Sequence, residues 1–143
     1  MSDENRGIDF ESPIANLQRY FIAADKMRIC FDNTVARPDI AKRLEELDSM
    51  DEKSGAALLL ALYMHDCGVF QFYWWSVLYV VIEGYEELKL HDEKIDALLQ
   101  SPHVDALKRL RHATFHFQNQ FFSRKMYPFL AAKDSVSWIG FAH

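Results

Sequence analysis

The chain lacks the features of secreted, disulfide-stabilised proteins. Only two of its 143 residues are cysteine, Cys30 and Cys67, and they form neither a CxxC pair nor a framework of short spacings. Such cysteine use fits a reducing compartment. The first residues, MSDENRGIDF, carry acidic charge and contain no apolar run, so no secretory signal peptide is predicted. We therefore expect a cytoplasmic protein.

Positive charge is also in short supply over the whole chain. Lys and Arg number 16 against 21 Asp and Glu, which gives a formal net charge of −5. This balance argues against a protein that coats nucleic acid or an anionic membrane through bulk electrostatics. Any anionic ligand must therefore meet a local patch of cations.

One apolar run, VFQFYWWSVLYVVI at residues 69–82, could be taken for a membrane span. A spanning helix needs about 20 apolar residues, and this run is shorter. His65 and Asp66 interrupt any extension toward the N-terminus. We expect the run to form a buried core helix and predict no contact with a membrane.

Strand-like alternation of apolar and polar residues is absent, as are internal repeats and low-complexity segments. Apolar residues recur instead at helical spacing in several segments. The chain is 50% hydrophobic and 26% charged, which is typical of a globular domain with one core. We predict an all-α helical bundle, with residues 1–143 as a single domain and with two or three long helices plus several short ones.

Proline and polar residues indicate where the first helices begin. Ser12-Pro13 predicts the start of a helix that continues to about residue 30, and Pro38 the start of a short second helix. A long helix is predicted from about Ser54 to about Lys89, with a kink at Gly68.

The second half of the chain is predicted to contain shorter helices. HDEKIDALLQ, residues 91–100, is brief and amphipathic, and Ser101-Pro102 predicts the start of a helix that ends near Phe122. Pro128 is expected to end any helical run, and Asp134-Ser135 to cap a last short helix through Trp138. Because DSVSWIGFAH looks like a helix that stops as it begins, a further C-terminal helix of the bundle could be missing.

The helix predicted after Ser101-Pro102 has two different faces. At about 100° per residue, one stripe turns toward the core; it consists of Leu107, Leu110, Thr114, Phe117 and Phe121. The opposite arc is polar and cationic, and it holds Lys108, Arg111, His112, Phe115 and His116. Phe115 is either a singly exposed apolar residue or an anchor in an interface.

The same segment concentrates the positive charge of the chain. Between His103 and Lys125, only Asp105 opposes five cations, which gives a formal charge of +4; the cations are Lys108, Arg109, Arg111, Arg124 and Lys125. They could form a solvated face that suits the C-terminal half of a helix. Alternatively, they form an anion site, for which phosphate is the natural ligand of arginine.

Residues 111–116, RHATFH, match the R-x4-H motif of the HEPN superfamily, and the stretch from about Leu58 to Phe122 resembles small bacterial members of that superfamily. The resemblance implies a helical bundle that forms a homodimer and cleaves RNA without a metal or other cofactor. It makes His116 the general acid or base that acts on the ribose 2′-hydroxyl or the leaving 5′-oxygen. Arg111 would neutralise the charge on the scissile phosphate, and His112 would orient one of them or bind phosphate.

The other cations complete this hypothesis. Lys108, Arg109, Arg124 and Lys125 are predicted to bind RNA or phosphate. On an ideal helix Arg111 and His116 lie about 140° apart, so a cleft between two chains could receive both, with Phe115 near the seam. The resemblance also implies a ribonuclease of the toxin or defence type. Such a protein would have an antitoxin or other partner protein, which the sequence does not identify.

A non-catalytic alternative keeps the fold but cleaves nothing: a HEPN-like homodimeric module that binds RNA or nucleotides, or acts as a scaffold. A metal site is a further alternative, because His112 and His116 stand at i and i+4. His103 or Glu83 would have to provide a third ligand. Glu83 could equally pair with Arg111 or face solvent.

Two other groups have simpler interpretations. His65-Asp66-Cys67 contains the residue types of a thiol site, but neighbouring helical positions point in different directions, so a structural cysteine is the better interpretation. An aromatic cluster could stack bases, but its helical spacing favours core packing; it consists of Phe70, Phe72, Tyr73, Trp74 and Trp75.

Overall fold

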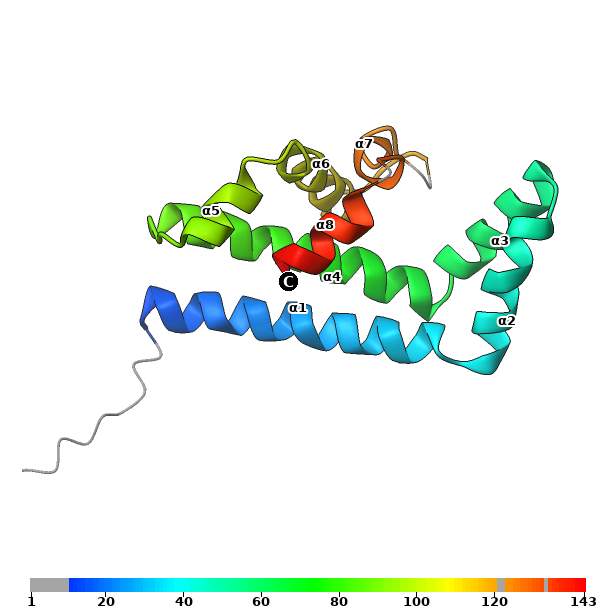
Figure 1. Ribbon diagram of the computed structural model, residues 1–143, viewed down its shortest axis with the longest axis horizontal. Coiled ribbons are helices and arrows are strands. Elements are labelled where there is room, and N and C mark those ends of the chain that lie inside the picture. The colour runs from blue at the N-terminus through cyan, green and yellow to red at the C-terminus, as the bar shows by residue number, and fades with distance from the viewer. Residues whose placement is uncertain (1–10, 121–122, 133) are drawn as a thin grey trace, which may run out of the picture.

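The computed structural model describes residues 11–120, 123–132 and 134–143. These residues contain eight α-helices, one short 3₁₀ helix and no strand. The prediction of an all-α bundle is therefore confirmed (Figure 1).

Two long helices, α1 (Pro13–Val35) and α4 (Asp66–Glu87), form the axis of the molecule. They lie side by side and antiparallel, and most of the remaining helices lie on the other side of α4 (Figure 1). Helix α1 begins at Pro13 as predicted but continues to Val35, beyond the expected end. Pro38 disfavours a helical conformation at Arg37, which explains why the helix ends just before this pair.

The predicted long helix from Ser54 to Lys89 is wrong, because the structure has two helices there. Helix α3 (Glu52–Tyr63) ends two residues before His65, and α4 continues at an angle of 71° to it. The kink expected at Gly68 lies at this break instead. Gly68 still matters, since a Cβ there would lie 2.8 Å from the carbonyl carbon of Tyr63.

Helix α2 (Pro38–Glu46) and the 3₁₀ turn (Leu47–Ser49) connect α1 to α3. Together α2 and α3 stand at one end of the α1–α4 pair (Figure 1). Among the described residues, no single helix is long and apolar enough to cross a membrane; only the bent α3–α4 pair passes a test of length and composition.

Helix α5 (Glu93–Leu99) is capped by Asp92, whose carboxylate accepts hydrogen bonds from the N–H groups of Lys94 and Ile95. Helix α6 (His103–Phe115) follows, and α7 (Tyr127–Leu130) and α8 (Ser135–Ala142) complete the chain. Pro128 was expected to end a helix but lies in the first turn of α7, where its missing N–H costs nothing.

The core forms where α1, α4, α6 and α8 meet. Trp75, Leu78, Leu107, Leu110 and Phe129 are buried there, and Ala24 of α1 allows the two long helices to approach closely. Trp74 and Trp75 therefore belong to the core, whereas Phe70 and Phe72 are half-buried and Tyr73 is exposed. Core packing explains this aromatic cluster better than base stacking.

Candidate functional site

Helix α6 carries the candidate site and is shorter than predicted. Ser101 supports its start, since the Ser101 hydroxyl accepts a hydrogen bond from the N–H of His103. The helix ends at Phe115, not near Phe122, and His116 is its C-cap with extended backbone angles. The side chains of Thr114 and Gln118 bind nearby carbonyl groups, and such local bonds compete with the helix.

The early end of α6 changes the predicted inward stripe. Leu107 and Leu110 are fully buried and Thr114 is half-buried, as expected. Phe117 was predicted to face the core but is 92% exposed, because the helical periodicity no longer applies beyond Phe115. Phe121 lies outside the described residues.

Four of the predicted phosphate-binding residues come together around one cavity. Its volume is about 540 Å³ and its lining is cationic; the lining residues are Lys108, Arg109, His112, Arg124 and Lys125. Helix α6 provides the first three, and the turn before α7 brings the last two back against it. The alternative of a solvated helix face does not require this convergence of two segments.

The two histidines of the motif lie against each other. The ring centroids of His112 and His116 are 4.3 Å apart, with 30° between the ring planes. Partial desolvation of this otherwise exposed ring lowers the pKa of His112, and the positive charges of Lys125, His116 and Arg111 lower it further. The His112 imidazole therefore favours its neutral form, which both donates and accepts hydrogen bonds.

Arg111 lies away from this cavity and does not line it. Its guanidinium pairs with the carboxylate of Glu83 on α4, with 3.6 Å between Nη2 and Oε2. The interpretation of Glu83 as a partner of Arg111 is thus confirmed. The Nε of Arg111 is buried and has no hydrogen-bond partner among the described residues.

Phe115 contacts its own chain on one side. Its ring meets that of Tyr73 edge to face, with 5.6 Å between the centroids, and its side chain is still 45% exposed. A role of Phe115 in an interface stays a prediction.

The metal alternative gains no third ligand from the residues named for it. His103 lies at the other end of α6, where its Nε2 is 3.0 Å from Asp134, and Glu83 pairs with Arg111. Within the described residues, no group of three His, Cys, Asp or Glu side chains could hold a metal ion.

The thiol alternative is opposed by the environment of Cys67. This side chain is buried, and burial raises the pKa of its thiol, which disfavours the reactive thiolate. His65 is exposed at the start of α4.

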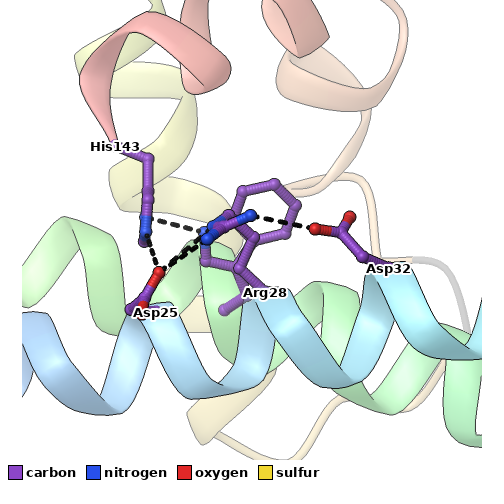
Figure 2. A network of polar contacts seen from close by, with 5 residues as sticks. Asp25, Arg28, Asp32 and His143 are labelled. Atoms are coloured by element: carbon purple, nitrogen blue, oxygen red, sulfur yellow. Dashed lines mark hydrogen bonds and ion pairs between the residues drawn. The ribbon is translucent and has the colours of Figure 1, made fainter.

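Sequence patterns did not indicate one polar cluster, which joins α1 to the residue that follows α8. His143 follows α8 and lies 3.1 Å from Asp25 of α1 through its Nε2, while the indole N–H of Trp74 donates to its Nδ1 at 3.2 Å (Figure 2). Arg28 pairs with both Asp25 and Asp32 beside it. Because Asp25 and His143 are 118 positions apart, no local spacing predicts this contact.

Comparisons of the chain with protein-family models, with curated proteins and with solved structures give no match. The resemblance to the HEPN superfamily therefore stays a hypothesis that depends on the motif and on its surroundings in this structure.

Proposed function

We propose that the chain is a metal-independent endoribonuclease of the HEPN toxin or defence type, with a composite site formed by the α6 ends of two subunits. The observation that supports this most is the cationic cavity beside the histidine pair. Four cations can bind a phosphodiester backbone, and an imidazole can transfer a proton to or from it.

The proposed reaction needs no metal or other cofactor. The 2′-oxygen of a ribose attacks the adjacent phosphorus, and His116 either takes the proton of this hydroxyl or gives one to the leaving 5′-oxygen. The bond from phosphorus to the 5′-oxygen breaks. The products are a 2′,3′-cyclic phosphate and a 5′-hydroxyl.

His112 has a supporting role in this proposal. A lowered pKa keeps its imidazole neutral near pH 7, so it suits an orienting hydrogen bond better than it suits charge pairing with phosphate. Lys108, Arg109, Arg124 and Lys125 would supply the charge that holds the RNA backbone.

Arg111 must exchange Glu83 for the scissile phosphate. Exposed ion pairs contribute only about 0 to 1 kcal/mol, and this one is long at 3.6 Å, so a phosphate can compete with it. A second subunit, meeting the first near Phe115, would bring a further motif to the same cleft.

The alternative is a non-catalytic homodimer that binds RNA or nucleotides. One observation favours it: Arg111 is held by Glu83 and does not line the cationic cavity. In this case the cavity binds phosphate groups and no bond is broken.

An RNA cleavage assay separates the two functions. Wild type and His116→Ala are incubated with labelled single-stranded RNA in the presence of EDTA, and the product ends are identified. We expect cyclic phosphate ends from the wild type and a loss of at least ~100-fold in rate for the variant, the usual contribution of a general acid or base. His91→Ala is the matched control, because His91 is exposed and lies before α5, outside α6 and the cationic cavity.

A binding assay decides the case in which no RNA is cleaved. Arg124→Ala/Lys125→Ala should weaken RNA binding and flatten its salt dependence, whereas Lys42→Ala/Arg43→Ala, an exposed pair on α2, should not. If the wild type binds RNA without cleaving it, and Arg124→Ala/Lys125→Ala loses that binding, the non-catalytic module is favoured. A wild type that is monomeric at micromolar concentration, or that neither binds nor cleaves RNA, would contradict the composite site.

A further inference from the structure

A second cavity, of about 740 Å³, lies between the first half of α1 and the last turns of α4. Helix α6 contributes only Lys108 to its lining. This volume falls within the usual range for small-molecule sites, about 300 to 1,000 Å³. Apart from Lys108 and Glu83, the proposed ribonuclease uses none of its lining residues.

The lining of this cavity is negative. Glu83, Glu86 and Glu87 contribute three carboxylates against the ammonium group of Lys108, and of the three only Glu83 also pairs, among the described residues, with a cation outside the lining, Arg111. Glu86 and Glu87 are exposed at the rim, and Glu83 is half-buried. Clefts that carry charge of one sign concentrate ligands of the opposite sign, so this cavity favours a cation.

Tyr79 provides an independent indication of a ligand. Its side chain is only 5% exposed and lines the cavity, and its hydroxyl has no hydrogen-bond partner among the described residues. Burial raises the pKa of Tyr79, and the charges of Glu83 and Glu86 raise it further, so the hydroxyl lies near carboxylates that line the same cavity. Because this hydroxyl has no protein partner among the described residues, a polar ligand group in the cavity can bond to it.

Apolar side chains form part of the remaining wall. Leu17, Val80 and Leu88 line the cavity, and the two long helices approach closely at Gly84, where a Cβ would lie 2.7 Å from Cδ1 of Leu17. A ligand that fills this space needs both cationic groups and an apolar body.

A metal ion does not have these properties. The three glutamates do not converge as metal ligands, and no such group of three occurs in the described part of the chain. Carboxylates that are spread along a partly apolar groove fit an elongated cation better than a point charge.

We propose that this cavity binds a linear polyamine, a molecule with ammonium groups spaced along a methylene chain. The ammonium groups pair with Glu83, Glu86 and Glu87 and donate a hydrogen bond to the Tyr79 hydroxyl. The methylene groups contact Leu17 and Val80. This site does not depend on the ribonuclease proposal, because Tyr79, Glu86 and Glu87 have no role there.

The test is calorimetric titration of spermidine into the full chain at low ionic strength. We expect saturable binding at one site per chain. Glu86→Gln/Glu87→Gln should weaken binding roughly tenfold through the loss of two charge pairs, and Tyr79→Phe roughly fivefold through one hydrogen bond. The matched control is Glu45→Gln/Glu46→Gln, which removes two adjacent exposed glutamates of α2 and should leave the affinity unchanged.

Three results would overturn the proposal. The first is the absence of saturable binding to the wild type. The second is an equal loss of affinity in the two double variants, which would mean that net charge alone attracts the ligand. The third is displacement of spermidine by Mg²⁺ at the same ionic strength, which would indicate a generic cation surface. Tyr79→Phe keeps the buried ring, and thermal melts of each variant show that it is folded.

Discussion

Four of the six histidines form two contrasting pairs. His103 and His143 have side chains only 10% exposed, and each contacts an aspartate, Asp134 at 3.0 Å and Asp25 at 3.1 Å. His112 and His116 contact each other at the exposed end of α6, with cations nearby and no carboxylate within ion-pair distance among the described residues.

The difference separates a structural histidine from one that is free to react. An imidazole between a carboxylate and aromatic rings has its hydrogen-bonding capacity used within the protein, so its removal should affect stability. An imidazole that lies among cations has unused capacity for an anionic ligand, so its removal should affect chemistry. Replacing His103 or His143 should therefore change the stability of the fold, whereas replacing His112 or His116 should change ligand binding or catalysis.

The largest effect on stability should come from His143→Ala. The change removes a ring that stacks on Phe21 at 5.3 Å and leaves the indole N–H of Trp74 without its acceptor. We expect a loss of roughly 3 kcal/mol in the free energy of unfolding, since a buried ring and a buried hydrogen bond are lost together. Urea denaturation measures it.

His91→Ala is the control for this prediction, because the His91 side chain is 84% exposed and makes only a distant contact to Asp96. Its free energy of unfolding should stay within about 0.5 kcal/mol of the wild type. If the two variants are equally stable, His143 does not anchor the segment after α8 to α1 and Figure 2 shows an incidental contact.

Acid should weaken the same anchor. The hydrogen bond from Arg28 and the one from His143 lower the pKa of Asp25 below its usual 3.8, and the His103 hydrogen bond lowers that of Asp134. A depressed carboxylate contributes stability that is present above pH 3.8 and is lost as the pH falls through the folded-state pKa. In thermal melts, Asp25→Asn should therefore be less stable than wild type at pH 7, and the difference should shrink below about pH 4.

Asp48→Asn provides the comparison for this pH series. Asp48 is exposed in the 3₁₀ turn, and its replacement should leave the acid dependence of the melting temperature as it is in the wild type. A difference between Asp25→Asn and wild type that stays constant from pH 7 to pH 2.5 would show that the charge of Asp25 does not stabilise the fold.

The contrast between the pairs also explains what could be predicted from the sequence. The clustering of cations in the sequence predicted an anion site, and the structure has a cationic cavity there. Lys108, Arg109 and His112 line it from α6, and the chain returns to it with Arg124 and Lys125. The Arg111–Glu83 pair was one of two alternatives for Glu83, the other being a glutamate that faces solvent. These contacts depend on local periodicity or on a short return of the chain.

The features that the sequence did not predict depend on contacts that local residue patterns do not reveal. The break before α4 requires the approach of the Tyr63 backbone to Gly68, and a hydrophobic repeat that continues through both helices hides it. The helical spacing of apolar residues continues past the end of α6 at Phe115, so Phe117 was assigned to the core although it is exposed. The pairing of Asp25 with His143 depends on the complete fold.

The smallest expected effect on stability concerns His112, and it tests directly whether this histidine has a structural role. Because the pKa of His112 is lowered from 6.5, the folded chain binds a proton at this position less well than the unfolded chain does. The wild type therefore loses stability as the pH falls through 6.5, down to the folded-state pKa, and His112→Gln does not have this loss. The two melting temperatures should agree at pH 7.5, and the variant should melt at a higher temperature than the wild type at pH 5. A variant that is clearly less stable at pH 7.5 would place His112 with His103 and His143 as a structural residue, and the proposed site would lose its orienting group.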